Sequence, residues 1–347
     1  MTPSSQRMEP PGISERFSPP HHLRLLLLPS GSGIESEKPT NEGAESMGPR
    51  RSTLLSPRFL HVVFPPERRP VRPLDLAAPC QAFPDGGEEP RFSREQASLI
   101  DWLFSRAGLD PRAYRDETLL RRLPACLRLL RVPTPSQAKR LLEENPGLIA
   151  PAMSVMLVGV TAFFRDPDVF DWLAREVVPR DASRPGLYVW SVGCSEGAEL
   201  HSLAILFAEN GRLEDSYLLG TDCRPDAVER ARAGLYDADA VKGVPQDLLE
   251  RYFQPDNGRW RVAPALRRRT RWAVSDLLKS IEPGAWDLIL FRNTAMYFRS
   301  EVVAGLWTRI ETVLRPGGLL VLGRAERPIG SSRLQLVRPC VFRRSRG

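Results

Sequence analysis

The segment Tyr188–Ala204, which reads YVWSVGCSEGAELHSLA, is the feature that most constrains how this chain folds. A short apolar run leads into a turn of small residues, Gly193–Gly197, and an apolar-periodic segment, Leu200–Phe207, follows at once. A strand, a glycine turn and a helix in this order let the backbone approach an adenosine-bearing ligand closely, because glycine has no Cβ. A tight strand-to-helix connection that binds nothing has the same pattern.

Strand and helix signals alternate from residue 188 to residue 322. Parallel strands joined by helices of about ten or more residues form doubly wound sheets, so we predict an α/β fold of this kind. Two short apolar runs after residue 330 predict an antiparallel pair at the edge of the sheet. The expected strands and helices are Tyr188–Val192, Leu200–Ala208, Tyr217–Gly220, Pro225–Ala233, Trp286–Leu290, Ser300–Val313, Leu319–Leu322, Leu334–Val337 and Cys340–Phe342.

Two further units accompany this sheet. Arg251–Phe253 and Trp260–Val262 flank the turn Asp256–Gly258 and predict an inserted β-hairpin. Before the sheet, helical periodicity predicts a small domain over residues 93–160, followed by the main domain over 161–347 with its insertion at about 251–262. Pro124 is expected to kink or divide the second helix. The expected helices of the small domain begin at Ser93 and cover Glu117–Leu130, Ser136–Glu144 and Pro151–Gly159.

Residues 1–92 have a different composition. Many of the 33 prolines lie there, among Gly- and Ser-rich stretches without a sustained period, which predicts a disordered or loosely packed leader. Its apolar spot, His21–Leu28, is too short to span a membrane and sits too late for a signal peptide. A packed leucine clip or a start codon upstream of the functional one, with Met47 as another candidate, is the expected explanation.

The reactive residues exclude several classes of protein. The five cysteines are scattered without a CxxC pair and there are only four histidines, so we predict no metal site, no disulfide framework and a cytoplasmic location. The net charge of +7 arises largely from arginine clusters such as Arg267–Arg269. Basic stripes interleaved with aromatic residues are typical of nucleic-acid binding, and the chain has none, so we do not expect a nucleic-acid partner.

Polar residues follow two of the expected strands. Asp222 comes after Tyr217–Gly220, and Arg292 and Asn293 come after Trp286–Leu290. Ligands of open α/β sheets bind at the carboxyl ends of the strands, where an acidic residue after the second strand accepts the ribose hydroxyls of a nucleoside. We therefore predict that Asp222 binds ribose. The alternatives are that Asp222 caps the next helix and that Arg292 and Asn293 form an ordinary turn.

Six motifs in a fixed order strongly resemble the CheR-type chemotaxis methyltransferases. The likeness covers about residues 93 to 342, and although each motif alone is modestly specific, six in the right order rarely arise by chance. Members of this family bind S-adenosylmethionine and methylate glutamate side chains on chemoreceptors. The motifs are Thr161–Pro167, Trp190–Ser195, Gly220–Asp222, Arg251–Phe253, Arg292–Asn293 with Tyr297–Phe298, and Pro316–Gly318 through Gly323 and Glu326.

The resemblance implies an S-adenosylmethionine-dependent methyltransferase fold with a small N-terminal helical domain and an inserted β-hairpin subdomain. It also implies that Tyr297 lies nearest to the transferred methyl group and, with Arg165, forms the catalytic pair. Arg121, Arg122 and Arg128 are expected to face an acidic receptor helix, although an ordinary solvated helix face is the alternative. The cofactor contacts that it implies are Thr161, Arg165, Gly193, Gly197, Glu199, Asp222, Asp276, Leu277, Arg292 and Asn293.

The chain departs from the family pattern in several places. Gly159 stands where the family usually has Asn, Ala198 replaces one of two glutamates after the glycine turn, and Asp276 replaces another Asn. The usual Gly-His-Ser-Glu reads Gly323-Arg324-Ala325-Glu326. Each lost hydrogen bond to a charged ligand group costs about 1.5–3 kcal/mol, so several losses weaken cofactor binding by powers of ten. Asp276 and Glu199 are the groups expected to compensate.

Three functions follow from this reading. The first is methyl transfer from S-adenosylmethionine to glutamate carboxylates of a methyl-accepting chemoreceptor or a similar signalling protein. The second is a degenerate methyltransferase-fold scaffold with weak or no cofactor binding, because of the motif departures. The third and weakest is methylation of RNA or of another protein, which only the basic excess favours.

Overall fold

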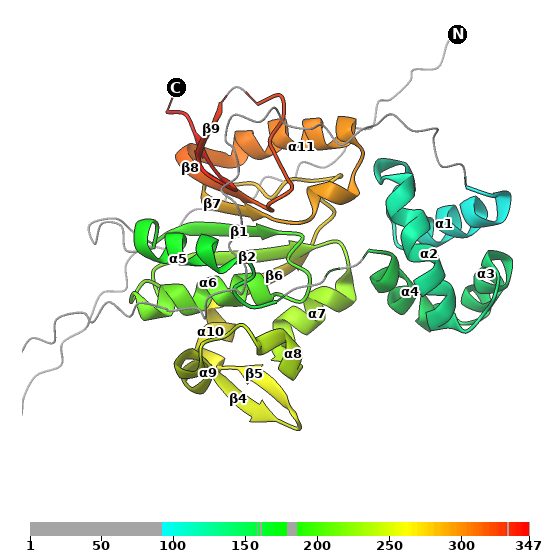
Figure 1. Cartoon of the computed structure of the whole chain (residues 1–347), viewed down its shortest axis with the longest axis horizontal. Coiled ribbons are helices and arrows are strands. Elements are labelled where there is room, and N and C mark those ends of the chain that lie inside the picture. Colours follow the sequence, from blue (N-terminus) through cyan, green and yellow to red (C-terminus); the bar gives the residue numbers. More distant parts are fainter. Residues whose placement is uncertain (1–91, 158, 160–161, 179–185, 332, 347) are drawn as a thin grey trace, which may run out of the picture. The chain divides into compact units, whose positions relative to one another are not determined.

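The structure is a computed structural model that describes residues 92–157, 159, 162–178, 186–331 and 333–346 (Figure 1). All of these residues belong to one unit, Leu60–Gly347. The predicted leader therefore lies outside the described residues, except for Phe92.

The N-terminal part of the described residues is helical, as the helical spacing of its apolar residues predicts. Ser93 starts the first helix with a capping box, since its side chain accepts from the Gln96 N–H while the Gln96 side chain accepts from the Ser93 N–H. Buried leucines and a phenylalanine at helical spacing then turn one face of this helix toward the core. The elements are α1 Arg94–Arg106, η1 Pro111–Ala113, α2 Asp116–Leu130, α3 Pro135–Glu144, η2 Pro146–Leu148 and α4 Ile149–Met156.

We expected Pro124 to kink or divide the second helix; α2 runs unbroken through Pro124, so the proline does not divide it. Pro124 is exposed, whereas Leu119, Leu123 and Cys126 are buried on the other side of the helix. An interior proline costs a helix about 3 kcal/mol, and each buried leucine returns a comparable amount. Tertiary packing therefore holds the helix together at a residue that would break it in isolation.

The main domain is built on a seven-stranded sheet in the order β6-β2-β1-β7-β8-β10-β9. Strands β6, β2, β1, β7 and β8 are parallel, and β10 and β9 add an antiparallel edge, which confirms the predicted doubly wound α/β class. The order reverses between β1 and β7, and ligands of such sheets bind at that switch point. The elements are α5 Pro167–Glu176, β1 Tyr188–Val192, α6 Ala198–Glu209, β2 Tyr217–Asp222, α7 Pro225–Ala233, β6 Thr270–Val274, β7 Trp286–Phe291, η3 Ala295–Tyr297, α11 Ser300–Val313, β8 Leu314–Leu322, β9 Leu334–Arg338 and β10 Val341–Arg344.

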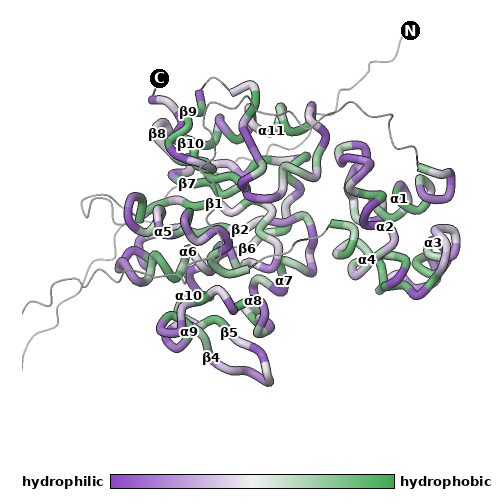
Figure 2. The backbone as a smooth tube through the Cα atoms, in the orientation of Figure 1, coloured by the Kyte–Doolittle hydropathy of each residue, from purple (hydrophilic) through white to green (hydrophobic). Residues whose placement is uncertain are grey.

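Side chains alternate between two cores on the two faces of this sheet. Leu288 and Leu290 join one buried cluster, while Ile289 and Phe291 between them join the other. The second cluster is continuous with the core of α1–α4, so the helical region and the main domain share apolar packing. Figure 2 shows the hydrophobic central strands and the hydrophilic tip of the hairpin formed by β4 (Phe253–Asp256) and β5 (Arg259–Val262). The strand period of two thus explains why Leu288–Phe291 of β7 is an uninterrupted apolar run.

The inserted unit is a three-stranded sheet, β3-β5-β4, with short helices around it. The predicted turn is present at Asn257–Gly258, but Arg251 and Tyr252 end helix α9 instead of starting a strand. Strand β6 was missed by the sequence reading, because its polar and apolar residues do not alternate. The elements are β3 Leu235–Tyr236, α8 Ala238–Val241, α9 Gln246–Tyr252, β4 Phe253–Asp256, β5 Arg259–Val262 and α10 Pro264–Arg269.

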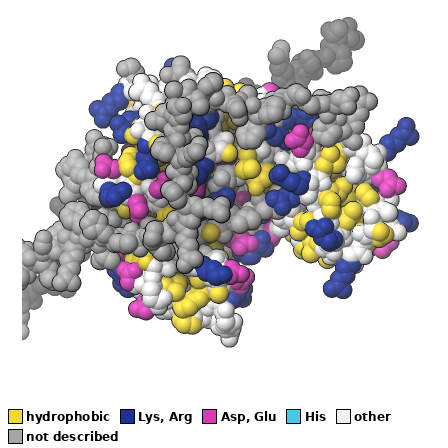
Figure 3. Space-filling view, in the orientation of Figure 1, with side chains coloured by type: hydrophobic (Ala, Val, Ile, Leu, Met, Phe, Trp, Pro, Cys, Tyr) yellow, Lys and Arg dark blue, Asp and Glu magenta, His cyan; other side chains and the backbone are white. Residues whose placement is uncertain are grey.

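Charges of both signs share the surface. Figure 3 shows Lys and Arg side chains interspersed with Asp and Glu on the visible face. Ion pairs account for part of this mixing, for example Arg251 with Glu209 and with Asp247. Among the described residues, every helix is too short or too polar to traverse a lipid bilayer.

Candidate functional site

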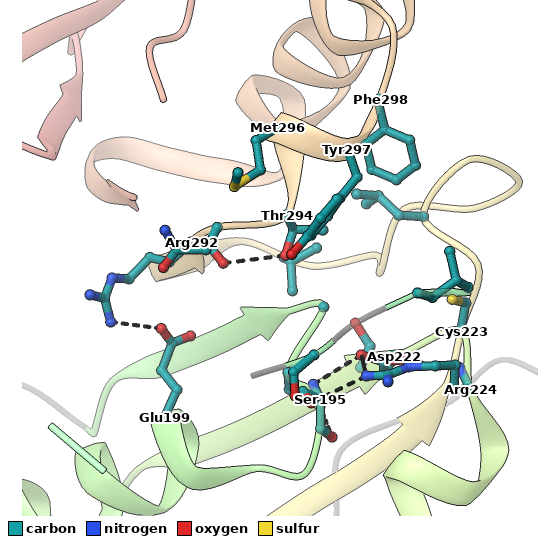
Figure 4. A pocket seen from close by; sticks show the side chains of 18 of the residues that line it. Ser195, Glu199, Asp222, Cys223, Arg224, Arg292, Thr294, Met296, Tyr297 and Phe298 are labelled. Carbon is teal, nitrogen blue, oxygen red and sulfur yellow. Dashed lines mark hydrogen bonds and ion pairs between the residues drawn. The ribbon is translucent and has the colours of Figure 1, made fainter. Parts of the chain in front are cut away.

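A cavity of about 270 Å³ lies where β1, β2 and β7 end (Figure 4). Its walls come from the turn after β1, the segment after β2, the loop after β7 and the helical region, which contributes Tyr114 and Arg122. The cavity is therefore at the carboxyl edge of the sheet, beside the switch point between β1 and β7, where an open α/β sheet binds its ligand.

The cavity collects most of the residues that the sequence singled out. Gly197, Arg121 and Arg128 do not line it, and Thr161 lies outside the described residues. Arg121 and Arg128 are exposed on α2, whereas Arg122 between them is partly buried. The predicted residues that line the cavity are Arg122, Arg165, Gly193, Glu199, Asp222, Asp276, Leu277, Arg292, Asn293 and Tyr297.

The two glycines of the turn after β1 have different surroundings. Gly193 lines the cavity with φ +63°, and a Cβ there would come within 2.7 Å of the Thr294 hydroxyl oxygen. Gly197 begins α6 with φ +86°, and a Cβ there would lie 2.5 Å from the Trp272 ring. Glycine is required at both positions for the left-handed backbone and for space. Gly193 lies at the cavity wall, whereas Gly197 packs against the core and does not line the cavity.

Asp222 is the most heavily engaged carboxylate of the cavity. Its Oδ1 accepts from the backbone N–H and from Nε of Arg224, both at 3.0 Å, and its Oδ2 accepts from the backbone N–H of Ser195 at 2.9 Å. Arg224 Nη2 reaches Oδ2 at 3.3 Å and the Ser195 hydroxyl at 3.2 Å. Both side chains of this ion pair are only 7% exposed. The local alternative is thus partly right, because Asp222 does bind the backbone that enters α7.

Gly159 makes room for this cluster. A Cβ at position 159 would lie 2.2 Å from the Ser195 hydroxyl oxygen and 2.5 Å from Arg224 Nη2. The Ser195 hydroxyl in turn donates to the Gly159 carbonyl at 3.0 Å. The glycine that departs from the family pattern is therefore coupled to Arg224, since a Cβ at 159 would displace the ends of the Ser195 and Arg224 side chains from their observed positions.

A second ion cluster closes the other end of the cavity. Arg292 donates to Glu199 Oε2 at 2.9 Å, to Asp166 Oδ2 at 2.6 Å and to the Arg165 carbonyl at 2.7 Å. The Ser191 hydroxyl donates to the other oxygen of Glu199 at 2.8 Å. Arg292 is 6% exposed, and its Nε has no hydrogen-bond partner among the described residues. This arginine fixes the Glu199 carboxylate at the cavity wall.

Position 198 does not belong to the cavity. Ala198 is fully buried among apolar residues of the core and its carbonyl accepts from the Ser202 hydroxyl at 2.7 Å. Glu199, the next residue, is the one whose side chain lines the cavity. The alanine that replaces a family glutamate therefore removes no carboxylate from the cavity wall of this structure.

The loop after β7 carries Tyr297 and is held by a buried carboxylate. Glu326 Oε2 accepts from the backbone N–H groups of Asn293 and Gly323, both at 2.8 Å, and Oε1 accepts from that of Met296 at 3.3 Å. Burial raises the pKa of Glu326, and these backbone N–H groups lower it in part. In Figure 4 the Tyr297 side chain extends from this loop into the cavity, across from Ser195, Asp222 and Arg224.

The helical region binds the same loop on its other side. Tyr114 and Phe298 form an antiparallel bridge, with their rings 5.0 Å apart. The Arg115 N–H donates to the Tyr297 carbonyl at 2.9 Å, and the Arg115 guanidinium donates to the Phe298 carbonyl at 2.8 Å. Arg122 on α2 reaches the cavity beside this bridge, and its buried Nε has no partner among the described residues. Helix α2 and the Tyr297 loop therefore form one wall.

Neither thiol of the cavity is a nucleophile at neutral pH. Burial raises the pKa of Cys194 well above its ordinary value, and burial followed by the charge of Asp222 raises the pKa of Cys223 to about 12. Within the part of the chain that the structure describes, no cluster of three or more His, Cys, Asp or Glu is placed to hold a metal ion. Carboxylates, arginines and a tyrosine are thus the chemistry of this site.

Several residues of the cavity wall were not predicted from the sequence. Arg224 and Ser195 were not singled out, although Arg224 stands two residues after Asp222 and Ser195 lies in the glycine turn. Tyr114 and Thr294 were also missed. The spacing of Asp222 and Arg224 was an available signal, because an arginine two residues after an aspartate is within reach of its carboxylate. The sequence did not show that this pair is buried in the wall of the cavity.

Proteins that match this chain include methyltransferases and one uncharacterized protein, and the family model that matches it is a methyltransferase domain. Residues 159–336 match the model of the CheR methyltransferase, SAM binding domain. Chemotaxis protein methyltransferase Cher2 of Pseudomonas putida is 34% identical over 196 residues, which cover 53% of this chain and 71% of that protein. Chemotaxis protein methyltransferase 1 of Pseudomonas aeruginosa is 34% identical over 200 residues, covering 54% and 73%.

A longer relative is an uncharacterized 104.1 kDa protein of Rhodobacter capsulatus, 33% identical over 221 residues. The match covers 61% of this chain but 23% of that protein. The cofactor of the matched domain is S-adenosylmethionine, as the sequence motifs implied. With more than half of its length matched by the family model, this chain belongs to the CheR methyltransferase family, as a divergent, S-adenosylmethionine-dependent member related to chemotaxis methyltransferases.

Proposed function

We propose that this protein transfers the methyl group of S-adenosylmethionine to glutamate carboxylates of a methyl-accepting chemoreceptor or a related signalling protein. The observation that carries the proposal is the single cavity in which Asp222 and Glu199 lie with Tyr297 and Arg122. Asp222 and Glu199, at the two ends of the cavity, offer acceptors for a nucleoside and an amino group, and Tyr297 and Arg122 offer donors for a carboxylate.

The cavity suits the cofactor. Gly193 lets the backbone form part of the wall, where any Cβ would collide with Thr294. Glu199 and Asp222 would hold the amino group and the ribose, with Asp276, Leu277 and Asn293 toward the base or the methionine part and Arg165 near the reacting atoms. Bound S-adenosylmethionine supplies an activated electrophilic methyl group, so the chain needs no general base for a carboxylate nucleophile.

The residues of the chain orient the acceptor. An attacking oxygen must lie in line with the methyl carbon and the sulfur, at about 3–3.5 Å. Tyr297 would donate to the substrate carboxylate, and Arg122 would pair with its charge through the Nε that lacks a partner in the described residues. Arg121 and Arg128, exposed on the same helix, would contact the acidic surface of the receptor outside the cavity.

The experiment uses the full chain, tritiated cofactor and a panel of purified chemoreceptor signalling domains. Base-labile methyl esters on receptor glutamates are expected, and Arg122→Ala lowers their rate of formation by about ten- to a hundredfold. Arg140→Ala, a change of an exposed arginine on α3, leaves the rate unaltered. Labelled receptor that keeps its label in base, or the absence of any label with every receptor, contradicts the proposal.

A scaffold without useful cofactor affinity is the second candidate, and one observation favours it. Each carboxylate oxygen of Asp222 and Glu199 already accepts at least one hydrogen bond from the chain itself. Calorimetry with S-adenosylhomocysteine, the demethylated product, separates the two functions. Micromolar affinity supports the enzyme, whereas no heat at millimolar ligand supports the scaffold.

A further inference from the structure

We infer that Arg224 sets the cofactor affinity of this protein by competing with the ribose hydroxyls for Asp222. The inference rests on the proposed placement of the ribose at Asp222. It adds that the side chain of Arg224 must leave this carboxylate before a ribose diol binds, so that Arg224 acts as a built-in competitor.

Asp222 already accepts as many hydrogen bonds as a carboxylate can. A carboxylate has about four acceptor positions, and here four donors use them: two backbone N–H groups and the Nε and Nη2 of Arg224. A ribose diol donates two hydrogen bonds of its own. The backbone N–H groups belong to the turn after β1 and to the entry of α7, so they cannot leave without unfolding these elements. Only the guanidinium is free to give way.

The guanidinium of Arg224 occupies part of the cavity wall. Arg224 lines the cavity, as Figure 4 shows, and its Nη2 also donates to the Ser195 hydroxyl at 3.2 Å. A cavity of about 270 Å³ is slightly smaller than the roughly 300–1,000 Å³ of typical ligand pockets. Withdrawal of an arginine side chain would enlarge the cavity at the place where the ribose is proposed to bind.

The absence of a side chain at Gly159 leaves the space that the Arg224 guanidinium occupies. Gly159 is the residue that tolerates Arg224, because a Cβ at 159 would lie 2.5 Å from Nη2. Burial alone lowers the pKa of Arg224, but the charge of Asp222 and its hydrogen bonds more than offset this, so the guanidinium stays charged. The pair is therefore a full ion pair in the cavity wall, with both side chains 7% exposed, and the ribose must replace charge-assisted hydrogen bonds.

Arg112 provides a matched control. Asp110 and Arg112 repeat the same pairing two residues apart, with Arg112 Nε at 3.0 Å and Nη2 at 2.9 Å from the carboxylate. The side chains of this pair are 88% and 48% exposed, for Arg112 and Asp110 respectively, and neither lines the cavity. Arg112→Ser thus removes the same interaction away from the proposed ribose.

The experiment measures the dissociation constant of S-adenosylhomocysteine by calorimetry on the full chain. Arg224→Ser is expected to tighten binding at least tenfold, and Arg224→Gln, which keeps a weaker hydrogen bond to Asp222, to tighten it less. Arg112→Ser leaves the constant unchanged. Adenosine gains affinity in Arg224→Ser, while 2′,3′-dideoxyadenosine gains none. Thermal unfolding of each variant shows that it is folded, and Arg224→Gln decides the matter if Arg224→Ser does not fold.

The outcomes separate this inference from the proposed function. Unchanged or weaker binding in both Arg224 variants overturns the inference, since the arginine would then be neutral or a cofactor contact. Adding Asp222→Asn to Arg224→Ser is expected to cancel the gain. If this double variant binds as tightly as Arg224→Ser, the ribose does not contact Asp222, and the placement of the cofactor in the proposed function is what fails.

Discussion

At the scale of single residues, the hydrogen bonds of the buried His201 determine its tautomer and keep it neutral. The Tyr236 hydroxyl donates to the Glu196 carbonyl at 2.6 Å, so His201 Nδ1, at 2.9 Å from that hydroxyl, must be the donor between them. His201 Nε2 is buried and has no partner among the described residues. Protonation would place a second N–H where nothing accepts it, and burial accordingly lowers the pKa of His201 to about 3.

This pKa predicts a loss of stability in acid. Between pH 6.5 and 3 the unfolded chain binds a proton at residue 201 that the folded chain does not, so the free energy of unfolding falls by about 1.4 kcal/mol per pH unit through His201 alone. His201→Asn keeps a donor near Nδ1 and does not titrate. Urea unfolding at several pH values between 6 and 4 gives the free energy of unfolding as a function of pH. In the variant this free energy should fall less steeply toward acid, by the slope that corresponds to one proton. Equal slopes would contradict the assignment.

The buried carboxylate of Glu326 is predicted to stabilise the loop that carries Tyr297. Glu326→Gln turns one acceptor oxygen into an amide that faces backbone N–H groups of the Tyr297 loop, which should cost about 1–3 kcal/mol of stability. Glu301→Gln, on the exposed surface of α11, should change stability by less than about 0.5 kcal/mol. Denaturant unfolding of both variants checks this. Equal effects would mean that the buried carboxylate does not hold the loop.

At the scale of elements, packing overrides local preference, and α2 is the clearest case. Pro124→Ala restores an N–H that can donate to the Leu120 carbonyl one turn earlier, and the exposed site leaves the packing undisturbed. We expect a gain of about 1–3 kcal/mol, because proline is about 3 kcal/mol worse than alanine inside a helix, and the more flexible unfolded chain of the alanine variant offsets part of this difference. Thermal unfolding measures the gain, with Arg121→Ala as the surface control; a loss would show that Pro124 is needed in place.

At the scale of the whole molecule, the cavity joins the helical region to the sheet. Tyr114 and Arg122 line it together with residues that follow β1, β2 and β7. A ligand that fills it should therefore stabilise both parts at once. S-adenosylhomocysteine at one hundred times its dissociation constant should add about 2.7 kcal/mol and raise the melting temperature by about 5–10 °C in one cooperative transition. Methionine should not, and a separate, unshifted transition would mean that the helical region takes no part.

The sequence predicted most of the main domain because its signals are local. The apolar run Leu288–Phe291 is buried on both faces of the sheet, and such a run predicts a central parallel strand without further information. The glycine turn after β1 adopts a left-handed backbone that favours glycine whatever the surrounding residues are. Strand β6 and the continuity of α2 were missed, since both depend on neighbours far along the chain. For the site, the motif order led to ten wall residues but not to Arg224 or Tyr114.

Two pairs of the same kind separate what the sequence determines from what the tertiary structure decides. Asp110 with Arg112 and Asp222 with Arg224 adopt the same local geometry, because an arginine two residues after an aspartate can reach both of its oxygens. One pair lies in solvent, and the other is only 7% exposed in the cavity wall. The pairing is local chemistry. Its burial, and with it any role toward a ligand, comes from the strands and helices that the fold assembles around it.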